Sequence, residues 1–557
     1  MKTSTELNAV VFKLIDFYCL DRVINMHNDR RDTLHNGRLK RILCLMCIVV
    51  SNAALGQQLT TPAITGAMNR LPLDKTVETS LAPLTLRYSA NLSELGVAGM
   101  GGSIYVGPSG VLLMDRVGKF YKIQGGVVEE LGIRTPSNFD LFLKENPQEK
   151  IAPGVVNATS FAYDPNHQKI YAAHNQYLGG DRIRMVVSSI KYDAHKLVTP
   201  EETSWTTIFK GDPIDGYSKG TDASAGKVIL VGNNLLLSTG FPGREDEKTV
   251  REVISKGSLA LTPPQDVKSL HSKLIKISLK DNSHQIYGFG QRNSQGMVLL
   301  SSGEILSTDH GPQGGDEINR IIKGGNFGHP IMTYGTRYGT YDYAWPAELM
   351  DKVPKNQKFE LPLFAFVPSI AINPIIEIKG FNQRFKGDLL VGALKAQSLY
   401  RLKYAEGRII FSEPIWTGHR IRDIFEFRNK IYLLTDDPHL ITLEVDAVKL
   451  ASNKTKDDKY FLSPTMQNKC MNCHSFDQTL PSSMAPKLSN LIGKRIGSDT
   501  FNRYSDGFKA SNLVWTKDNL AKFLANPSEL VPGTAMPKVN LNENEVNELV
   551  EILSSYR

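Results

Sequence analysis

The chain has 557 residues, of which 41% are hydrophobic and 22% are charged, and its formal net charge at pH 7 is +8. This composition excludes a disordered chain and is typical of a soluble globular protein. A chain of this length exceeds one compact core, so we predict two folded domains. The positive charge is modest and forms no basic run, so we do not expect the protein to bind nucleic acid.

Residues 1–56 are predicted to be an export signal peptide. Arg38, Lys40 and Arg41 precede the apolar run ILCLMCIVV, and small residues follow it. The run is too short to span a bilayer. A short membrane anchor or a buried helix is the alternative, and the long polar lead makes Met26 an alternative start. We therefore predict a periplasmic or secreted protein that does not span a membrane once the signal is removed.

The positions of the five cysteines support export. Cys19, Cys44 and Cys47 lie in the predicted signal, so the mature chain would keep only Cys470 and Cys473. No disulfide framework and no additional thiol would then remain to oxidise in an oxidising compartment.

Residues 57–79 are predicted to be a linker, and residues 80–448 are predicted to form an all-β propeller. Short apolar strands alternate with tight turns, as in KIYAAHN, KVILVGNNLLLSTG, GMVLLSSGEILSTDHG, GDLLVGALK and KIYLLTDD. The pattern recurs roughly every 60 residues, which predicts six blades of four strands. A double β-sandwich is the alternative.

The segment GFGQRNSQGMVLLSSGEILSTDHGPQGGDEINRIIKGGNFGHP, residues 288–330, resembles the soluble quinoprotein glucose and aldose-sugar dehydrogenases. VGALK at 391–395 and GHRIRD at 418–423 match the same family in the same order. The resemblance covers residues 80–445 and is stronger in the second half. These dehydrogenases are six-bladed propellers that bind pyrroloquinoline quinone (PQQ) and calcium. The resemblance therefore implies this fold, both cofactors and a small-molecule substrate such as a sugar or an alcohol.

The resemblance also implies how both cofactors are held. PQQ carries three carboxylates and an ortho-quinone, so its site must supply fixed positive charge. The residues that match the PQQ-binding positions of the family are Arg292, Asn293, Lys395, Arg420 and Arg422. The backbone carbonyls of Gly311 and Pro312 match those that hold the calcium ion, which polarises the quinone. Asp316 and Glu317 follow on the same loop.

The catalytic base of the family has no counterpart in this chain. In the family, a histidine in a segment of the form N/D-H-x-x-G-R removes the hydroxyl proton of the sugar. The aligned segment TDASAGKV has Ala223 at the histidine position, and Phe241 stands where the orienting carboxylate belongs. Asp222 is a weak candidate for a replacement base, and the alternative is that it is a surface turn residue.

Residues 449–461 are predicted to be a second linker, and residues 462–557 to be a haem domain. Its motif NKCMNCH places two thiols, Cys470 and Cys473, where they can attach covalently to the two vinyl groups of haem c. His474 then lies beneath the iron. A zinc knuckle or a redox dithiol is the alternative, but zinc needs a second ligand pair and a dithiol does not need the histidine.

Residues 462–557 resemble a class I cytochrome c of the mitochondrial and c2 type, which is all-α. Pro486 lies 12 residues after His474, where the family has a proline whose carbonyl holds the proximal imidazole. Met536, in PGTAMP, lies 62 residues after His474, at the place of the second iron ligand. Met484 is the rival thioether and lacks this loop. The resemblance thus implies one haem c whose iron is bound by His474 and Met536.

Three more residues match haem contacts of the cytochromes. Tyr504 and Trp515 stand where family members bond a haem propionate, and Thr534 stands where a hydroxyl lies near the axial methionine. The apolar stripe Val546, Leu549, Val550 and Leu553 predicts a final helix at 543–555, which Asn542 would cap.

Together, the two domains predict an exported quinohaemoprotein oxidoreductase. Its propeller would oxidise a sugar or alcohol-type substrate and pass electrons singly to the tethered haem, then to a soluble cytochrome or a terminal oxidase. The alternative is a non-catalytic electron-transfer or ligand-binding protein, because Ala223 replaces the catalytic histidine. A dehydrogenase of another substrate with a different base is a third hypothesis.

Overall fold

The computed structural model describes residues 71–147, 156–193, 204–215, 225–241, 263–336, 358–452, 463–470, 473–474, 485–501 and 503–555. The predicted signal, Asp222, Ala223 and Met484 lie outside these residues. Within the described part of the chain, no helix is both long and apolar enough to cross a membrane.

The first part of the structure is a six-bladed β-propeller made of antiparallel sheets. Five sheets each contain four strands that are consecutive along the chain. These strands are β3 (Ser103–Gly107), β4 (Gly110–Met114), β5 (Lys119–Gln124), β6 (Val127–Arg134), β7 (Ala158–Asp164), β8 (Lys169–Tyr177), β9 (Arg182–Lys191), β10 (Thr206–Asp215), β11 (Ala225–Val231), β12 (Asn234–Thr239), β13 (Lys273–Ser278), β14 (His284–Phe289), β15 (Ser294–Leu299), β16 (Ile305–Asp309), β17 (Asp316–Arg320), β18 (Phe364–Phe366), β19 (Ile372–Glu377), β20 (Leu389–Ala393), β21 (Ser398–Ala405) and β22 (Arg408–Trp416).

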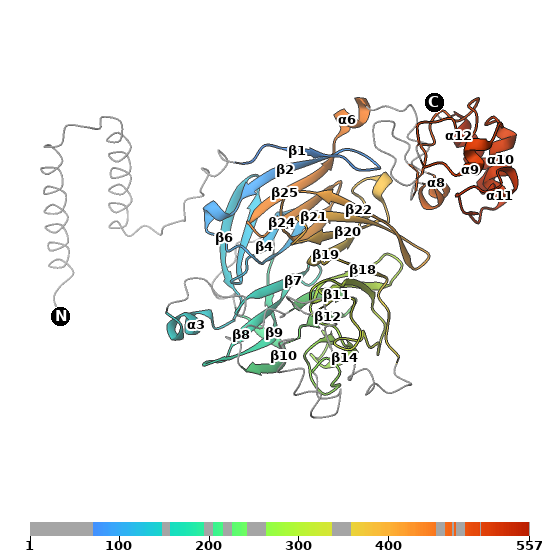
Figure 1. Cartoon of the computed structure of the whole chain (residues 1–557). Helices are drawn as coiled ribbons and strands as arrows, with labels where there is room; N and C mark the ends of the chain where they lie inside the picture. Colours follow the sequence, from blue (N-terminus) through green and yellow to red (C-terminus); the bar gives the residue numbers. More distant parts are fainter. Residues whose placement is uncertain are drawn as a thin grey trace, which may run out of the picture. The chain divides into compact units, whose positions relative to one another are not determined.

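The sixth sheet combines strands from both ends of the propeller segment. Its order is β1-β2-β25-β24-β23, with β1 (Lys75–Val77), β2 (Leu84–Asn91), β23 (Ile421–Phe427), β24 (Lys430–Thr435) and β25 (His439–Val445). Strand β2 pairs with β25, and Figure 1 shows blue β2 beside orange β25. The strands β3, β7, β11, β15, β19 and β23 contact one another in a ring. The β2–β25 pairing therefore completes the last blade.

This closing blade corrects the prediction of four strands in every blade. Its fifth strand, β1, lies within the predicted linker 57–79, so the sheet begins before residue 80. A three-residue strand is too short to show a period-2 pattern, so β1 could not be predicted from the sequence.

Apolar side chains pack between neighbouring blades. Leu434 and Leu440 of the closing blade, for example, pack against Ile104 and Val106 of β3. Because a blade is covered on both faces, its central strands are almost continuously apolar, and all five residues of β20 are buried. The outermost strand β22 buries one residue of nine. This difference explains why the central strands were easily identified from the sequence.

The remaining elements are helical. In the propeller segment they are η2 (Ser93–Leu95), α3 (Phe139–Glu145), η6 (Gln383–Phe385) and α6 (Ala447–Ser452). The C-terminal part contains α8 (Pro464–Lys469), α9 (Asp506–Ala510), α10 (Lys517–Ala525), α11 (Pro527–Leu530) and α12 (Glu543–Ser555). These C-terminal helices and their loops fit a class I cytochrome c domain.

Helix α12 has the bounds predicted from its apolar stripe. Leu549 and Leu553 are buried, and Ile552, which was not included in the stripe, is buried as well. Asn542 Oδ1 accepts a hydrogen bond from the Glu545 N–H at 3.0 Å, and the Glu545 carboxylate accepts one from the Asn542 N–H at 2.8 Å. This reciprocal pair is a capping box.

We expect Asn542→Ala to lower the free energy of unfolding of the haem domain by about 1 kcal/mol, because it removes the acceptor for a helix N–H group. Denaturant unfolding of the haem-loaded protein, followed by haem absorption, measures this change. Asn547→Ala is the control, because Asn547 is an exposed residue inside the same helix and not at its start. An equal loss in both variants would contradict a specific role for the Asn542 cap.

Candidate functional site

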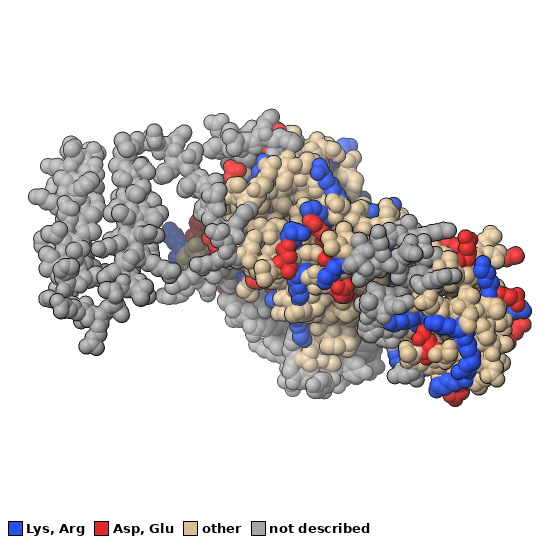
Figure 2. Space-filling model, turned by 90° about the horizontal axis from the view of Figure 1, so that it is seen from above, with Lys and Arg blue, Asp and Glu red and all other residues tan. Residues whose placement is uncertain are grey.

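The predicted PQQ and calcium residues lie in loops at the ends of propeller strands. Ser294 at the start of β15 pairs with Asp309 at the end of β16, and Ile421 at the start of β23 pairs with Thr435 at the end of β24. In both blades, the residues just before the first strand (β15 or β23) therefore lie beside the loop that follows the second strand (β16 or β24). Figure 2 shows that basic and acidic side chains are interspersed on the visible face of the described residues.

Asp309 anchors the segment that carries Arg292 and Asn293. The backbone N–H groups of Arg292 and Asn293 donate to its two carboxylate oxygens at 2.9 Å and 2.6 Å. The Arg292 guanidinium donates to the carbonyl of His310 at 3.3 Å. Burial raises the pKa of Asp309 to about 6, although these two backbone hydrogen bonds oppose the shift. The segment predicted to contact PQQ is thus tied to β16.

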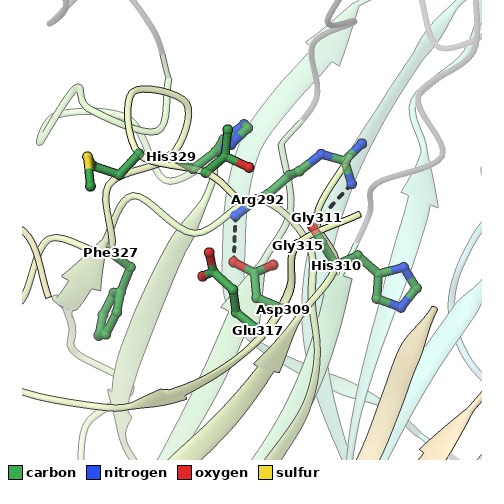
Figure 3. Close-up of a pocket in the computed structure, with 10 residues that line it drawn as sticks. Arg292, Asp309, His310, Gly311, Gly315, Glu317, Phe327 and His329 are labelled. Carbon is green, nitrogen blue, oxygen red and sulfur yellow. Dashed lines mark hydrogen bonds between the residues drawn. The ribbon is translucent and has the colours of Figure 1, made fainter. Parts of the chain in front are cut away.

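A small pocket lies beside this anchor, and Figure 3 shows the carboxylates of Asp309 and Glu317 side by side in it. Glu317 is the cross-strand partner of Asp309, and burial followed by the charge of Asp309 raises the pKa of Glu317 to about 8. Gly311 lines the same pocket, whereas Pro312 is buried outside its lining. Two carboxylates and backbone oxygens form a hard donor set, which fits calcium.

The shape of this loop explains why residue 311 is a glycine. A Cβ atom at Gly311 would collide with the backbone oxygens of Gly314 and Gly315. The loop between β16 and β17 therefore folds back tightly on itself, and Gly311 and Gly315 both line the pocket.

The raised pKa of Glu317 predicts a pH-dependent stability of the calcium-free protein. Folded Glu317 keeps its proton up to about pH 8, whereas the unfolded chain loses it near the ordinary pKa of 4.5. The folded state binds more protons in this window, so the free energy of unfolding should fall as the pH rises from about 4.5 to about 8. Glu317→Gln should reduce this fall and stabilise the protein at pH 8 by about 1 kcal/mol or more.

Thermal unfolding in the presence of a chelator, at several pH values, measures the effect. Glu406→Gln is the control, because the Glu406 side chain is 70% exposed. A wild-type midpoint that rises between pH 5 and pH 8, with no change in Glu317→Gln, would show that Glu317 ionises normally.

Arg420 and Arg422 converge on Asp436, a residue that sequence reasoning did not identify. The Nε atom of each arginine donates to one carboxylate oxygen of Asp436 at 2.7 Å. The Asp436 side chain is 6% exposed, while those of Arg420 and Arg422 are 44% and 18% exposed. A guanidinium has five N–H donors, so both arginines retain donors for a ligand carboxylate.

Lys395, the third predicted PQQ-binding cation of this part of the chain, is exposed just after β20. These cations fit the charge of PQQ.

Phe241, which the sequence alignment predicts to stand at the position of the family's orienting carboxylate, is a buried aromatic residue. Phe241 is 3% exposed, and its ring lies edge-on to His329 with the centroids 5.3 Å apart. Its backbone N–H donates to the carbonyl of Arg292 at 2.8 Å, so it lies beside the predicted PQQ segment. The predicted base position itself, Ala223 with neighbouring Asp222, lies outside the described residues.

Two histidines in this pocket were given no role in the sequence analysis. Burial lowers the pKa of His310 to about 4 and holds the pKa of His329 well below its ordinary value. Both imidazoles are therefore neutral and weakly basic. The family's base aligns with residue 223, far from these histidines in the sequence, whereas DHGP and FGHP lie within the segment that matches the family.

In the C-terminal part, all eight predicted haem residues line one cavity of about 300 Å³. They are Cys470, Cys473, His474, Pro486, Tyr504, Trp515, Thr534 and Met536. Most of the other lining side chains are apolar, including Leu488, Phe508 and Phe523. The structure therefore brings together two thiols, an imidazole and a thioether in an apolar cavity, and this set fits a covalently attached haem.

The orientation of His474 is fixed by the proline carbonyl that the sequence predicted. Its Nδ1 donates to the Pro486 carbonyl at 2.7 Å, which leaves Nε2 as the atom that would bind iron. Burial lowers the pKa of His474, although this hydrogen bond opposes the shift. The backbone N–H of His474 donates to the Cys470 carbonyl at 3.0 Å, which holds the motif in a tight turn.

The other haem candidates are held by packing and one local hydrogen bond. Tyr504 stacks on Phe508 with an interplanar angle of 7°, and burial raises its pKa to about 12, so its hydroxyl remains a donor. Trp515 is 7% exposed. Thr534 Oγ1 accepts a hydrogen bond from the Met536 N–H at 3.2 Å, which orders the loop that carries the predicted iron ligand.

Comparison with known proteins also separates a sugar-dehydrogenase propeller from a C-terminal cytochrome c domain. The Glucose / Sorbosone dehydrogenase family model matches residues 154–442. The aldose sugar dehydrogenase YliI of Escherichia coli is 28% identical over 196 residues, which cover 31% of this chain and 50% of the relative. The chain thus spans half the length of that relative.

A solved structure and a cytochrome extend the comparison. The soluble aldose sugar dehydrogenase from Escherichia coli, in its apo-form, aligns with a TM-score of 0.50 and 18% identity over 65% of this chain and 99% of that chain, which shows a shared fold. The cytochrome c of Stellaria longipes is 32% identical over 88 residues, covering 16% of this chain and 82% of the relative. The chain carries a class I cytochrome c domain towards its C-terminus. Its propeller matches the family model over more than half of the chain, so the chain belongs to the glucose/sorbosone dehydrogenase family.

Proposed function

We propose that the protein is a PQQ-dependent dehydrogenase that delivers electrons to its own haem c. One observation carries this proposal: a single chain combines a sugar-dehydrogenase propeller bearing clustered cations with a cavity lined by two thiols, an imidazole and a thioether. When bound, PQQ would supply two-electron oxidation and haem c one-electron transfer.

In the propeller, the chain's own residues bind and orient the cofactor. Arg420 and Arg422 are held by Asp436 and would pair with PQQ carboxylates together with Lys395 and Arg292. Asn293 would contribute a polar contact from the same anchored segment. The Gly311 and Pro312 carbonyls would hold calcium, and the Asp309 and Glu317 carboxylates would balance its charge.

In the cytochrome domain, His474 and Met536 would both bind the iron of haem c. A thioether opposite an imidazole raises the reduction potential, which favours acceptance of electrons from the propeller. Because two side chains would bind the iron, reaction of the haem with oxygen would be disfavoured. The apolar lining of the cavity suits the macrocycle of haem c.

For the substrate we propose an aldose or a related alcohol, since the Escherichia coli relative is an aldose sugar dehydrogenase. We propose export through residues 1–56 and a soluble cytochrome or terminal oxidase as the next electron acceptor. The propeller would comprise residues up to 448, preceded by β1, and the cytochrome residues 462–557.

A second candidate, a propeller that binds PQQ without oxidising a sugar, is favoured by Phe241. This buried ring occupies the place of the carboxylate that orients the base in the family, and it packs on His329. Under the first candidate, Asp222 is the proposed replacement base.

The test uses the full-length, haem-loaded protein with PQQ and calcium, without oxygen. Aldoses, alcohols and aldehydes are added separately while haem reduction is followed by absorption. The first candidate predicts substrate-dependent reduction that disappears when PQQ is omitted. The second predicts PQQ binding by calorimetry without reduction by any substrate. No PQQ binding in the presence of calcium would contradict both.

A further inference from the structure

Four polar side chains outside the cofactor sites gather on the closing blade. Tyr88 lies on β2, His419 lies in the connection from β22 to β23, Asp437 follows β24, and His439 is the first residue of β25. Of these, His419 and Asp437 are direct chain neighbours of Arg420 and Asp436. The family resemblance assigned no role to any of the four.

The distances among three of these side chains match a metal coordination sphere. One ligand atom from each of His419, Asp437 and His439 lies within 4.8 Å of the other two. The Nδ1 atoms of His419 and His439 lie 3.2 Å and 3.3 Å from the same carboxylate oxygen of Asp437. Ligands bound at about 2.0–2.2 Å from a tetrahedral ion are separated by about 3.3–3.5 Å, so the spacing suits such an ion.

One of these atoms is buried and faces the carboxylate without forming a well-directed hydrogen bond. The Nδ1 atom of His439 lies 3.3 Å from the Asp437 oxygen, an ion-pair distance, but the geometry is not that of a hydrogen bond. A cation placed between the imidazole and the carboxylate would bind both groups.

Tyr88 contributes an outer contact that fixes one of the rings. Its hydroxyl lies 2.6 Å from Nε2 of His419. If Nε2 carries the proton and donates to Tyr88, Nδ1 keeps its lone pair and faces the Asp437 carboxylate. Ligand histidines in metal sites commonly have their second nitrogen held in this way.

We propose that His419, Asp437 and His439 form a site for a divalent transition-metal ion of the zinc type. Two imidazole nitrogens and one carboxylate oxygen suit such an ion better than calcium or magnesium, which prefer all-oxygen sites. The Asp437 side chain is 56% exposed, so an ion in solution can reach the carboxylate.

The metal would strengthen the closure of the propeller ring. His439 pairs with Asn91 of β2, and Tyr88 of the same strand contacts His419 across 331 residues of chain. An ion that binds only the folded arrangement stabilises it by mass action. Zinc should therefore raise the thermal midpoint of the propeller.

The test is zinc binding to the full-length, haem-loaded protein after removal of metals and restoration of calcium. Equilibrium dialysis with metal analysis gives the stoichiometry and affinity, and thermal unfolding gives the midpoint. The variants are Asp437→Asn, which changes an exposed side chain, His439→Gln and Tyr88→Phe. His167→Gln is the matched control, because His167 is 69% exposed and contacts Asp164 at 2.7 Å.

We expect one zinc equivalent that Asp437→Asn and His439→Gln lose, while Tyr88→Phe weakens binding by about 10-fold and His167→Gln changes nothing. The rise in thermal midpoint should disappear in the same variants. An equivalent retained by both Asp437→Asn and His439→Gln, or no zinc bound by the wild type at micromolar concentration, would overturn the proposal. Neither result depends on PQQ binding or on substrate oxidation.

Discussion

Met536→Ala should abolish the sulfur-to-iron absorption band near the red end of the visible spectrum. It should also lower the midpoint potential of the haem by on the order of 0.1 V, within the span of about 0.8 V that axial ligands can set. The reason is that a thioether stabilises ferrous iron, and alanine leaves water or a stronger donor to take its place. Haem titration with redox mediators measures the potential.

The rival thioether provides the control for this experiment. Met484→Ala should leave the band and the potential unchanged. Survival of the band in Met536→Ala, together with its loss in Met484→Ala, would reassign the iron ligand. Thr534→Val should retain the band but weaken it at raised temperature, because it removes the acceptor for the Met536 N–H.

Arg422→Ala should weaken PQQ binding by about 10- to 100-fold. A hydrogen bond between charged groups contributes about 1.5–3 kcal/mol. The change also removes one of the two arginines that pair with Asp436. Arg420→Ala should have a smaller effect, because the Arg420 side chain is 44% exposed and solvent screens its charge. Calorimetric titration of the calcium-loaded protein with PQQ measures both affinities.

Arg408 offers a matched control for the loss of a positive charge. Its side chain is 72% exposed and contacts Glu406 at 3.5 Å. Arg408→Ala should bind PQQ like the wild type. Equal affinities for all three variants would place the cofactor away from Arg420 and Arg422.

The sequence predicted best those features that depend on residues close together in the chain, such as buried strands and the haem attachment motif. Central strands such as β12 and β20 were predicted because both faces are buried, and this leaves a continuous apolar run. The covalent haem motif and its spacing to Pro486 and Met536 similarly predicted residues that line one cavity. In each case, the residues that burial or haem attachment requires are consecutive in the sequence or lie at a fixed sequence spacing.

Features that depend on strand pairing could not be predicted in the same way. Glu317 becomes the neighbour of Asp309 only through the register between β16 and β17, and Asp436 reaches both arginines only because β24 lies beside β23. Strand β1 is too short to show a period. The sequence shows that Phe241 departs from the family pattern, but only the structure shows His329 packed against it.

The pairing of β2 with β25 has a consequence for the order of events during synthesis. Arg87 accepts a hydrogen bond from Thr442, 355 residues later. At about 5–20 residues per second, the ribosome needs roughly 20–70 s between making one partner and the other. During this interval β2 is an unpaired edge, which invites aggregation. A chain that stops before β25 would keep this exposed edge, whereas a chain that stops after Val445 would have every strand of the ring.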